Sequence, residues 1–149
     1  MERGISKHPP LIEYKLIHEK AQVPKRNLEG DAGYDLAVCE DATVPANGFL
    51  NIGTGVTVAC PSGYWLRLCG RSSTFYKRQL LVIEGVIDNG YRGELRIQVQ
   101  NLRPYSHRLT CGDRIAQIIP MPVISFEWQS VIELKPSERG SNGFGSSGN

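Results

Sequence analysis

The chain has 149 residues, of which 40% are hydrophobic and 21% charged, and its formal net charge at pH 7 is +2. This size and composition are typical of one soluble globular domain with a real core. The small net charge argues against a polymeric nucleic acid as partner, and no apolar run reaches membrane-spanning length, so we also expect no membrane partner.

The apolar residues occur in short runs separated by turn formers, and no segment of helical length keeps a period of 3.6 residues. This pattern predicts an all-β fold of the sandwich, jelly-roll or barrel kind. One or two helical turns are expected over residues 72–78, because a serine can cap their start and no Gly or Pro interrupts them. The expected strands are residues 11–17, 34–38, 49–52, 55–59, 64–69, 80–87, 94–102, 108–110, 114–120 and 123–128.

The cysteines and the N-terminal residues indicate the compartment. Cys39, Cys60, Cys69 and Cys111 form no Cys-x-x-Cys pair, so we expect reduced, half-buried thiols rather than a zinc site or a disulfide framework. The first ten residues carry charges and two prolines where a secretory signal would need an apolar run. We therefore expect a cytoplasmic protein, or a nuclear one if the source or host is eukaryotic.

The Asn89-Gly90 pair lies between two apolar runs and predicts a β-hairpin with a two-residue type I′ turn. Asp88 and Tyr91 would then be a cross-strand pair on one side of the ribbon, with a carboxylate and a phenol ring close together at its tip. An acidic residue beside a turn, with a tyrosine packed nearby, is the plainer interpretation.

Polar groups at three other places suit an anion or a buried contact. Arg71, Ser72 and Ser73 follow a glycine and begin the expected helical turns, which would gather a guanidinium, two hydroxyls and backbone N–H groups. A capped helix start beside a solvated arginine is the alternative. Gln117 lies among apolar neighbours and needs a hydrogen-bond partner if it is buried. Asp35 is an acid at the start of a strand and says little by itself.

The C-terminal residues 139–148 read Arg-Gly-Ser-Asn-Gly-Phe-Gly-Ser-Ser-Gly and follow every expected strand. A guanidinium, an aromatic ring and serine hydroxyls on a glycine-rich backbone suit a polyphosphate with a flat base attached. We predict a single β domain over residues 1–136 and a flexible Gly-rich arm over residues 137–149 that closes over an active site. A flexible tail without function is the alternative.

Five segments of the chain together resemble the five ordered motifs of the trimeric dUTPases (deoxyuridine triphosphate nucleotidohydrolases). In order, they are DAGYDL at residues 31–36, Arg71-Ser72, GVIDNGYRGE at residues 85–94, GDRIAQ at residues 112–117 and RGSNGFGSSG at residues 139–148. The resemblance spans nearly the whole chain. It implies a jelly-roll-like β fold assembled as a homotrimer, with active sites between subunits and the C-terminal arm of one subunit closing over a neighbour's site.

The activity that the resemblance implies is hydrolysis of dUTP to dUMP and pyrophosphate with Mg²⁺, which limits uracil in DNA and supplies dUMP for thymidylate. Asp88 would be the general base that activates water for attack on the α-phosphorus. Tyr91 would lie under the deoxyribose and leave no room for a 2′-hydroxyl. The backbone of Gly85, Val86 and Ile87 would bind uracil and reject cytosine, whose edge has the inverted hydrogen-bonding pattern.

The resemblance also implies contacts with the triphosphate and its metal ion. Asp35 would contact Mg²⁺ through the water shell of the ion, which suits a cation that keeps its waters. Phe144 would stack over the uracil. Contacts with the phosphates are implied for Arg71, Ser72 and Gln117, with Ser73 beside them, and for Arg139, Gly145, Ser146 and Ser147 of the arm.

The chain departs from the family pattern in three places. The second motif usually reads Pro-Arg-Ser-Gly-Leu, whereas residues 70–74 read Gly-Arg-Ser-Ser-Thr, which changes the surroundings of Ser73. Glu84 directly precedes the expected uracil-binding residues and receives no role. The four cysteines match nothing in the catalytic motifs.

Two other functions fit parts of the pattern. dCTP deaminase resembles the dUTPases in fold and trimer but uses a glutamate, for which Glu84 and Glu94 are candidates. A regulatory binding protein of the same fold, without enzymatic activity, is the second alternative. The Asp88 and Tyr91 pair, together with an arm that carries Arg139 and Phe144, favours the hydrolase.

Overall fold

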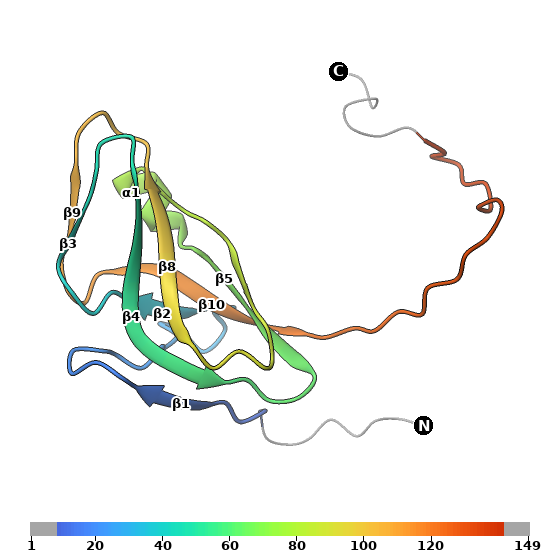
Figure 1. Cartoon of the computed structure of the whole chain (residues 1–149), viewed down its shortest axis with the longest axis horizontal. Coiled ribbons are helices and arrows are strands. Elements are labelled where there is room, and N and C mark those ends of the chain that lie inside the picture. Colours follow the sequence, from blue (N-terminus) through green and yellow to red (C-terminus); the bar gives the residue numbers. More distant parts are fainter. Residues whose placement is uncertain (1–8, 142–149) are drawn as a thin grey trace.

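The computed structural model describes residues 9–141, which form antiparallel sheets and one short helix (Figure 1). The first sheet has the strand order β1 (Glu13–Leu16), β4 (Phe49–Ala59), β8 (Glu94–Asn101), β6 (Leu80–Val82). The second has the order β2 (Tyr34–Ala37), β10 (Arg114–Pro122), β5 (Tyr64–Gly70), β7 (Gly85–Ile87). A two-stranded sheet consists of β3 (Ala42–Val44) and β9 (His107–Leu109). The all-β prediction is confirmed.

The two four-stranded sheets pack face to face around one apolar core. Strand β8 shows the pattern most clearly, because Leu95, Ile97 and Val99 are buried and alternate with more exposed residues. This period of two places one face of the strand on the core and the other toward solvent. Both sheets contribute to the core, which includes Leu36, Val38, Ile52, Val56, Leu66, Leu68, Leu80, Leu109, Ile115 and Ile118. The result is the predicted jelly-roll-like sandwich.

The helix α1 (Ser72–Arg78) has the predicted bounds, but its start differs from the prediction. Arg71 rather than a serine is the N-cap, and it makes no side-chain capping bond. The helix ends at Gln79, which adopts the left-handed conformation with φ of 52°. Thr74 ties α1 to the second sheet, because its buried hydroxyl donates to the carbonyl of Ile115 at 2.8 Å.

Strand β4 joins two segments that the sequence predicts as separate strands. The register between β4 and β8 shifts between Gly53 and Thr57, which marks a β-bulge. Gly55 has φ of +67° there, and its N–H donates to the Glu94 carboxylate at 2.9 Å. A carboxylate from the neighbouring strand therefore binds the irregular backbone, so that the chain continues as one strand.

Other predicted strands are wrong in their boundaries. Residues 80–87 form two strands, β6 and β7, which belong to different sheets. Residues 123–128 form no strand; they leave the sandwich as exposed chain. The sequence analysis missed β3, whose three residues are too short to show a period. No helix within residues 9–141 has the length and apolar character needed to cross a bilayer.

The hairpin predicted at Asn89-Gly90 is also wrong. Strand β7 pairs with β5, and β8 pairs with β4 and β6, so the strands that flank the turn lie in different sheets. A β-turn is present, because the N–H of Tyr91 donates to the carbonyl of Asp88 at 3.0 Å. Neither Asn89 nor Gly90 has the positive φ that a type I′ turn requires. Asp88 and Tyr91 are thus the ends of a turn between sheets, not a cross-strand pair.

All four cysteines are free thiols, as predicted, but the prediction that they are half-buried is correct for only one of them. Cys39, Cys60 and Cys69 are buried, and Cys111 is half-buried. Burial raises the pKa of the thiols of Cys39, Cys60 and Cys69, so these side chains are protonated and poorly reactive at neutral pH.

Candidate active site

Three residues that are predicted to contact phosphate or metal lie close together at the second sheet. Asp35 on β2 and Gln117 on β10 are directly opposite each other in the strand register. Arg71 directly follows β5, the strand on the other side of β10. The Nε of Arg71 lies 2.9 Å from Oδ1 of Asp35, and Nε2 of Gln117 donates to the carbonyl of Gly70 at 3.1 Å. We call Asp35, Arg71 and Gln117 the sheet cluster.

The Arg71 guanidinium is held from two sides. Besides its ion pair with Asp35, its Nη1 donates to the carbonyl of Arg114 at 2.9 Å. Oδ2 of Asp35 accepts a hydrogen bond from Nδ2 of Asn27 at 3.0 Å, and the Asp35 residue is only 7% exposed. A carboxylate so buried needs a paired charge and hydrogen bonds. Within residues 9–141, Nη2 of Arg71 makes no hydrogen bond, so a donor is left for a ligand.

The side chain of Gln117 packs against Gly33, and any larger residue at position 33 would force this side chain to move. A Cβ atom on Gly33 would lie 2.1 Å from Oε1 of Gln117. Gly33 is buried, so the side chain of Gln117 occupies the space that a larger residue would need. Ser72 and Ser73, in the first turn of α1, are exposed and half-buried respectively, next to Arg71 in the chain.

Strand β7 is an edge strand of the same sheet that carries the sheet cluster. Gly85, Val86 and Ile87 pair with Leu68, Arg67 and Leu66 of β5. The opposite edge of β7 makes no backbone hydrogen bond to any other part of the described chain. Backbone donors and acceptors at such an edge can bind an extended group or a base.

The turn that follows β7 carries Asp88, which is exposed. No hydrogen bond or ion pair of its carboxylate occurs within residues 9–141. Tyr91, at the other end of the turn, is fixed by a hydrogen bond from its hydroxyl to the carbonyl of Glu94 at 2.9 Å. The turn therefore combines an available carboxylate with an anchored ring.

Asn89 has a role that the sequence analysis missed. Its Nδ2 donates to the carbonyls of Cys60 at 2.8 Å and Pro61 at 2.7 Å, and lies 3.4 Å from that of Tyr64. The sequence analysis treats Asn89 only as a turn former. The side-chain amide binds the loop between β4 and β5, which is distant in the sequence. No signal in a single sequence identifies that loop.

Both glutamates proposed for a deaminase are engaged. Glu84 pairs with Arg67 of β5, with Nε of Arg67 3.3 Å from Oε2, and the pair is exposed to solvent. Glu94 accepts hydrogen bonds from the N–H of Gly55 at 2.9 Å and from Nη1 of Arg96 at 2.7 Å. The structure thus gives Glu84 the partner that the sequence did not reveal.

A second ion pair supports α1 beside the sheet cluster. The Arg78 guanidinium binds Asp113 with two hydrogen bonds of 2.8 and 3.1 Å. Oδ2 of Asp113 also accepts from the N–H of Thr110 at 3.0 Å. The Arg78 hydrogen bonds lower the pKa of Asp113 below its ordinary value, which marks a stabilised carboxylate. The pair fixes the end of α1 to the turn before β10.

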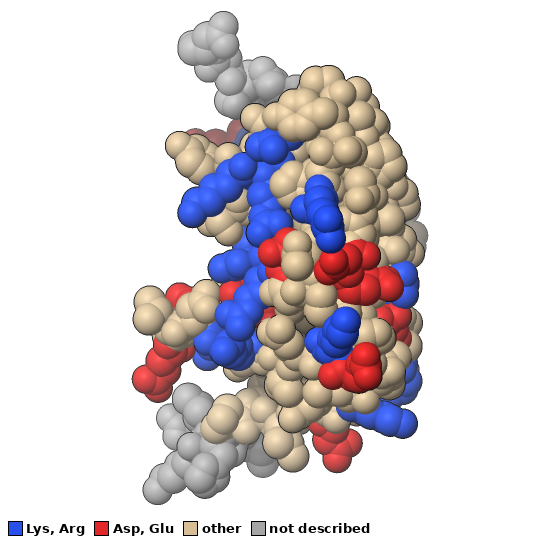
Figure 2. Space-filling view, turned by 90° about the vertical axis from the view of Figure 1, so that its left-hand side faces the viewer, with Lys and Arg blue, Asp and Glu red and all other residues tan. Residues whose placement is uncertain are grey.

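The surface charge is uneven although the net charge is small. Figure 2 shows Lys and Arg side chains in a nearly continuous band on one face, with acidic side chains grouped beside it. A band of one sign attracts anions more strongly than the net charge alone suggests.

The described part of the C-terminal arm, residues 137–141, does not join the sheet cluster of its own chain. Residues 123–141 run away from the sandwich (Figure 1). Arg139 lies on this exposed segment. Phe144, Gly145, Ser146 and Ser147 lie outside the described residues, and the predicted domain boundary at residue 136 stays a prediction.

The metal-binding capacity of the described residues is small. Residues 9–141 contain no group of three or more His, Cys, Asp or Glu side chains that could hold a metal ion. Asp35 already binds Arg71 and Asn27 with its two oxygens. These residues fit a cation that is held mainly by a ligand's phosphates and contacted through water, as Mg²⁺ commonly is.

Comparison with known proteins gives consistent matches over most of the chain. The dUTPase family model matches residues 19–148. The chain is 41% identical over 138 residues to the deoxyuridine 5'-triphosphate nucleotidohydrolase of Paramecium bursaria Chlorella virus 1, covering 93% of this chain and 97% of the relative. The Arabidopsis thaliana protein of the same name is 37% identical over 145 residues, covering 97% and 87%.

Solved structures agree with the sequence matches. The Staphylococcus bacteriophage 80alpha dUTPase with dUPNHPP has a TM-score of 0.87 and 32% identity, covering 95% of this chain and 100% of that one. A mutant dUTPase of phage phi11 of S. aureus, described with a structural Mg(II) ion, has a TM-score of 0.77 and 29% identity, covering 83% and 98%. The sequence match includes the sheet cluster, the turn after β7 and the C-terminal arm, and the chain belongs to the dUTPase family.

Proposed function

We propose that this protein hydrolyses dUTP to dUMP and pyrophosphate. The proposal rests on two groups of residues that occur together in this member of the dUTPase family. One is the sheet cluster around Arg71, which suits phosphate, and the other is the exposed Asp88 carboxylate, which directly follows the edge strand β7. The relatives with 41% and 37% identity bear the name of this activity.

The free edge of β7 supports recognition of uracil. Backbone groups of Gly85, Val86 and Ile87 are fixed on one side by pairing with β5. Rigid donors and acceptors discriminate strongly, since a base with the inverted pattern leaves buried groups unpaired. Cytosine presents such a pattern at N3 and C4, so this edge selects uracil.

The sheet cluster supports binding of the triphosphate. Arg71 keeps Nη2 available while its other nitrogens are held, and Ser72 is exposed next to it. A guanidinium whose orientation is already fixed loses little freedom when it binds phosphate. Gln117 and Ser73 complete this set of contacts. Mg²⁺, when bound with the substrate, neutralises phosphate charge, and Asp35 contacts it through water.

Asp88 is the general base of the proposed reaction. Its carboxylate accepts a proton from water, whose oxygen then forms a bond to the α-phosphorus as the bond to the leaving pyrophosphate breaks. Arg71, and Arg139 of an arm, stabilise the charge that develops on the leaving group. Tyr91, anchored through Glu94, lies under the deoxyribose and excludes a 2′-hydroxyl.

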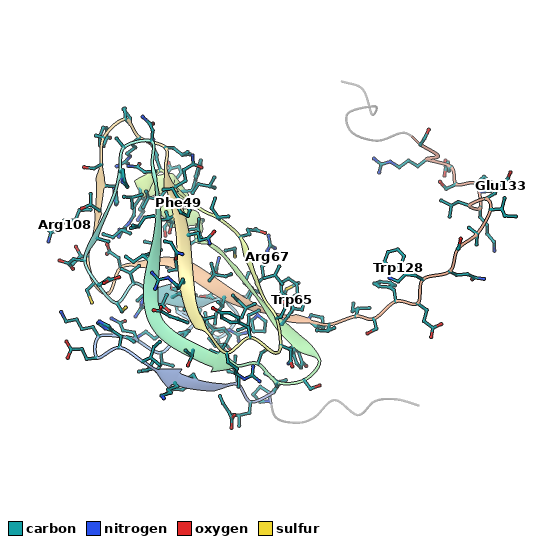
Figure 3. The ribbon with its side chains drawn as sticks, viewed as in Figure 1. Phe49, Trp65, Arg67, Arg108, Trp128 and Glu133 are labelled. Atoms are coloured by element: carbon teal, nitrogen blue, oxygen red, sulfur yellow. The ribbon has the colours of Figure 1, made fainter. Side chains whose placement is uncertain are left out.

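Exposed apolar side chains support a homotrimer with exchanged arms. Trp128 is 97% and Ile132 101% exposed on the segment that leaves the sandwich, where Figure 3 labels Trp128 and Glu133. Phe126 and Leu134 are exposed there as well. A row of such side chains indicates contact with another protein surface. We propose that this surface is a neighbouring copy, whose site the arm closes with Arg139, Phe144, Gly145, Ser146 and Ser147.

The monomer also has a cavity that is separate from the proposed site. This cavity of about 290 Å³ lies beside β1 and is lined mainly by apolar residues and prolines. None of the proposed substrate contacts lines it. The proposed substrate contacts therefore lie outside this cavity, on other parts of the surface.

The deaminase alternative depends on Glu84 and Glu94. Glu84 forms an exposed ion pair with Arg67, and Glu94 accepts hydrogen bonds from Gly55 and Arg96, so the structure gives both carboxylates other partners. The family membership, rather than these contacts, favours the hydrolase. A regulatory role remains compatible with hydrolysis. The phage 80alpha dUTPase is described as controlling the transfer of virulence genes, but nothing in residues 9–141 of this chain indicates such a partner.

One assay tests the proposal. The purified chain is incubated with dUTP and Mg²⁺, and release of pyrophosphate is followed, with dCTP, dTTP and UTP in parallel. We expect release from dUTP and little from the others. Ammonia release from dCTP, or no pyrophosphate from dUTP, would overturn the proposal.

A further inference from the structure

We infer that Asn89 is a positioning residue for Asp88, an inference that rests on the proposed function. The Asp88 turn connects β7 of the second sheet to β8 of the first. The loop between β4 and β5 also passes from one sheet to the other, and it contains Cys60 and Pro61. The side chain of Asn89 joins these two connections.

This side chain is the sole polar anchor of the turn. Within residues 9–141, the hydrogen bonds of Asn89 are the only ones that tie residues 88–92 to a distant part of the chain. The other bonds are local: Tyr91 N–H to the Asp88 carbonyl, the Tyr91 hydroxyl to Glu94, and Arg92 to the carbonyls of Asn89 and Tyr91. Local bonds define the shape of the turn. Besides the strands that the turn connects, Asn89 provides the hydrogen bonds that fix the place of the turn relative to the sheets.

The chemistry of the contact requires an amide. The two short bonds, 2.8 and 2.7 Å, use both hydrogens of the Nδ2 group. A carboxylate of the same shape has no hydrogen to donate and would face two carbonyl oxygens, so it would push the turn away. Truncation to alanine would leave both carbonyls without this partner. Either change frees the turn without touching the Asp88 side chain.

A displaced base affects turnover more than binding. The proposed phosphate and metal contacts lie on β2, on β10, at the start of α1 and at Arg71, which follows Gly70 at the end of β5. Asn89 reaches only the opposite end of β5, where its Nδ2 lies 3.4 Å from the carbonyl oxygen of Tyr64. A misplacement of about 1 Å at a catalytic group can reduce the rate on the order of 100-fold. The dUTP affinity should change little, because the phosphate contacts remain in place.

The test uses the full chain with Asn89→Asp, Asn89→Ala and a matched control, Asn101→Ala. The Nδ2 of Asn101 donates to the carbonyls of Pro45 at 3.1 Å and Tyr105 at 2.8 Å, at the other end of β8. For both Asn89 variants we expect kcat to fall roughly 10- to 100-fold with KM within about threefold of the wild type. For Asn101→Ala we expect a lower Tm and an unchanged kcat per folded molecule.

A second measurement does not depend on activity. Amide hydrogen exchange of residues 88–92 should become faster in both Asn89 variants, while exchange in β8 and β10 stays as in the wild type. The inference is overturned if the Asn89 variants keep their kcat, if KM rises as kcat falls, or if exchange at residues 88–92 is unchanged. A wild-type chain that does not hydrolyse dUTP would instead overturn the proposed function, and the exchange result would still test the anchor.

Discussion

The sheet cluster and the Asp88 turn hold functional groups in different ways. Asp35 and Gln117 lie in paired strands, and Arg71 is bonded to Asp35 and to the carbonyl of Arg114. Asp88 lies on a connection between sheets that one side chain anchors. The groups proposed to bind phosphate are thus fixed by the sheet itself, whereas the group proposed to activate water is placed by a local contact. Binding and chemistry should therefore respond differently to mutation.

The largest expected effect is on turnover, in a variant that changes the Asp88 turn and leaves the sheet cluster intact. Asp88→Asn keeps the size of the side chain but cannot accept a proton from water. Because the Asp88 carboxylate has no partner within the described chain, stability should not change. We expect turnover to fall by roughly 10² to 10⁴ with nearly unchanged affinity for dUTP. Steady-state kinetics and thermal melting check this, and a variant that keeps a tenth of its activity contradicts the assignment.

A mixing experiment asks whether the arm acts on a neighbouring chain. One variant carries Asp88→Ala with an intact arm, and the other keeps Asp88 but stops at Pro136. Each alone should be nearly inactive. After joint unfolding and refolding, about a quarter of the interfaces would combine a functional Asp88 with an intact arm from another chain. Recovered dUTP hydrolysis supports exchange; hybrid trimers no more active than their parents exclude it.

Arg71→Ala should affect binding and folding together, in contrast to changes at Asp88. It removes a proposed phosphate contact and leaves the buried Asp35 carboxylate without its paired charge. Breaking such a pair costs about 3 kcal/mol of the free energy of unfolding. Urea unfolding and the dUTP dissociation constant are the measurements. The double variant with Asp35→Asn is the control, because it removes the uncompensated charge and should recover part of the stability.

Tyr91→Ala tests whether the turn also reads the sugar. The hydrogen bond from the Tyr91 hydroxyl to the carbonyl of Glu94 restrains the ring, which opposes its movement for a larger sugar. We expect the kcat/KM for UTP relative to dUTP to rise roughly tenfold in the variant. Tyr91→Phe keeps the ring but loses the anchor and should show a smaller rise. An unchanged UTP/dUTP ratio in Tyr91→Ala argues against the role.

The smallest expected effect concerns the Arg78–Asp113 ion pair beside the sheet cluster and its contribution to stability at low pH. Arg78 lowers the pKa of Asp113 in the folded chain below the ordinary value of 3.8. The unfolded chain therefore binds a proton at Asp113 more readily than the folded chain does. The ion pair stabilises the fold fully above about pH 4, and this stabilisation is lost as the pH falls through the pKa of Asp113 in the folded chain. Asp113→Asn should lower Tm at pH 7 and reduce the loss of Tm between pH 5 and 3. An identical acid profile in the variant contradicts this.

The sequence predicts the fold better than it predicts the contacts between sheets. Alternation in β8, the turn formers and the bounds of α1 are local signals, and the structure confirms them. The Asn89-Gly90 hairpin is wrong because turn propensity does not determine which strands pair. The register shift in β4 depends on Glu94, which lies 39 residues from Gly55. Such a contact has no local signature in the sequence.

For the candidate site, too, the sequence predicts the residues but not the contacts between them. The residue types and their order in the chain predict Asp35, Arg71, Asp88 and Gln117 through the family resemblance. They do not predict the ion pair between Asp35 and Arg71, because the two residues are far apart in the sequence. The partner of Glu84 and the anchoring by Asn89 likewise depend on which strands lie side by side.

The Asp35 carboxylate gives Arg71 a counter-ion before any substrate arrives. Chloride or inorganic phosphate from the medium therefore meets a guanidinium whose charge is already largely balanced, and gains little by binding to it. A nucleoside triphosphate brings several charges and its own cation, so it can share Arg71 with Asp35 without displacing that carboxylate. If Arg71 binds the triphosphate as proposed, this counter-ion should reduce competition for the site by the simple anions that are abundant in any cell.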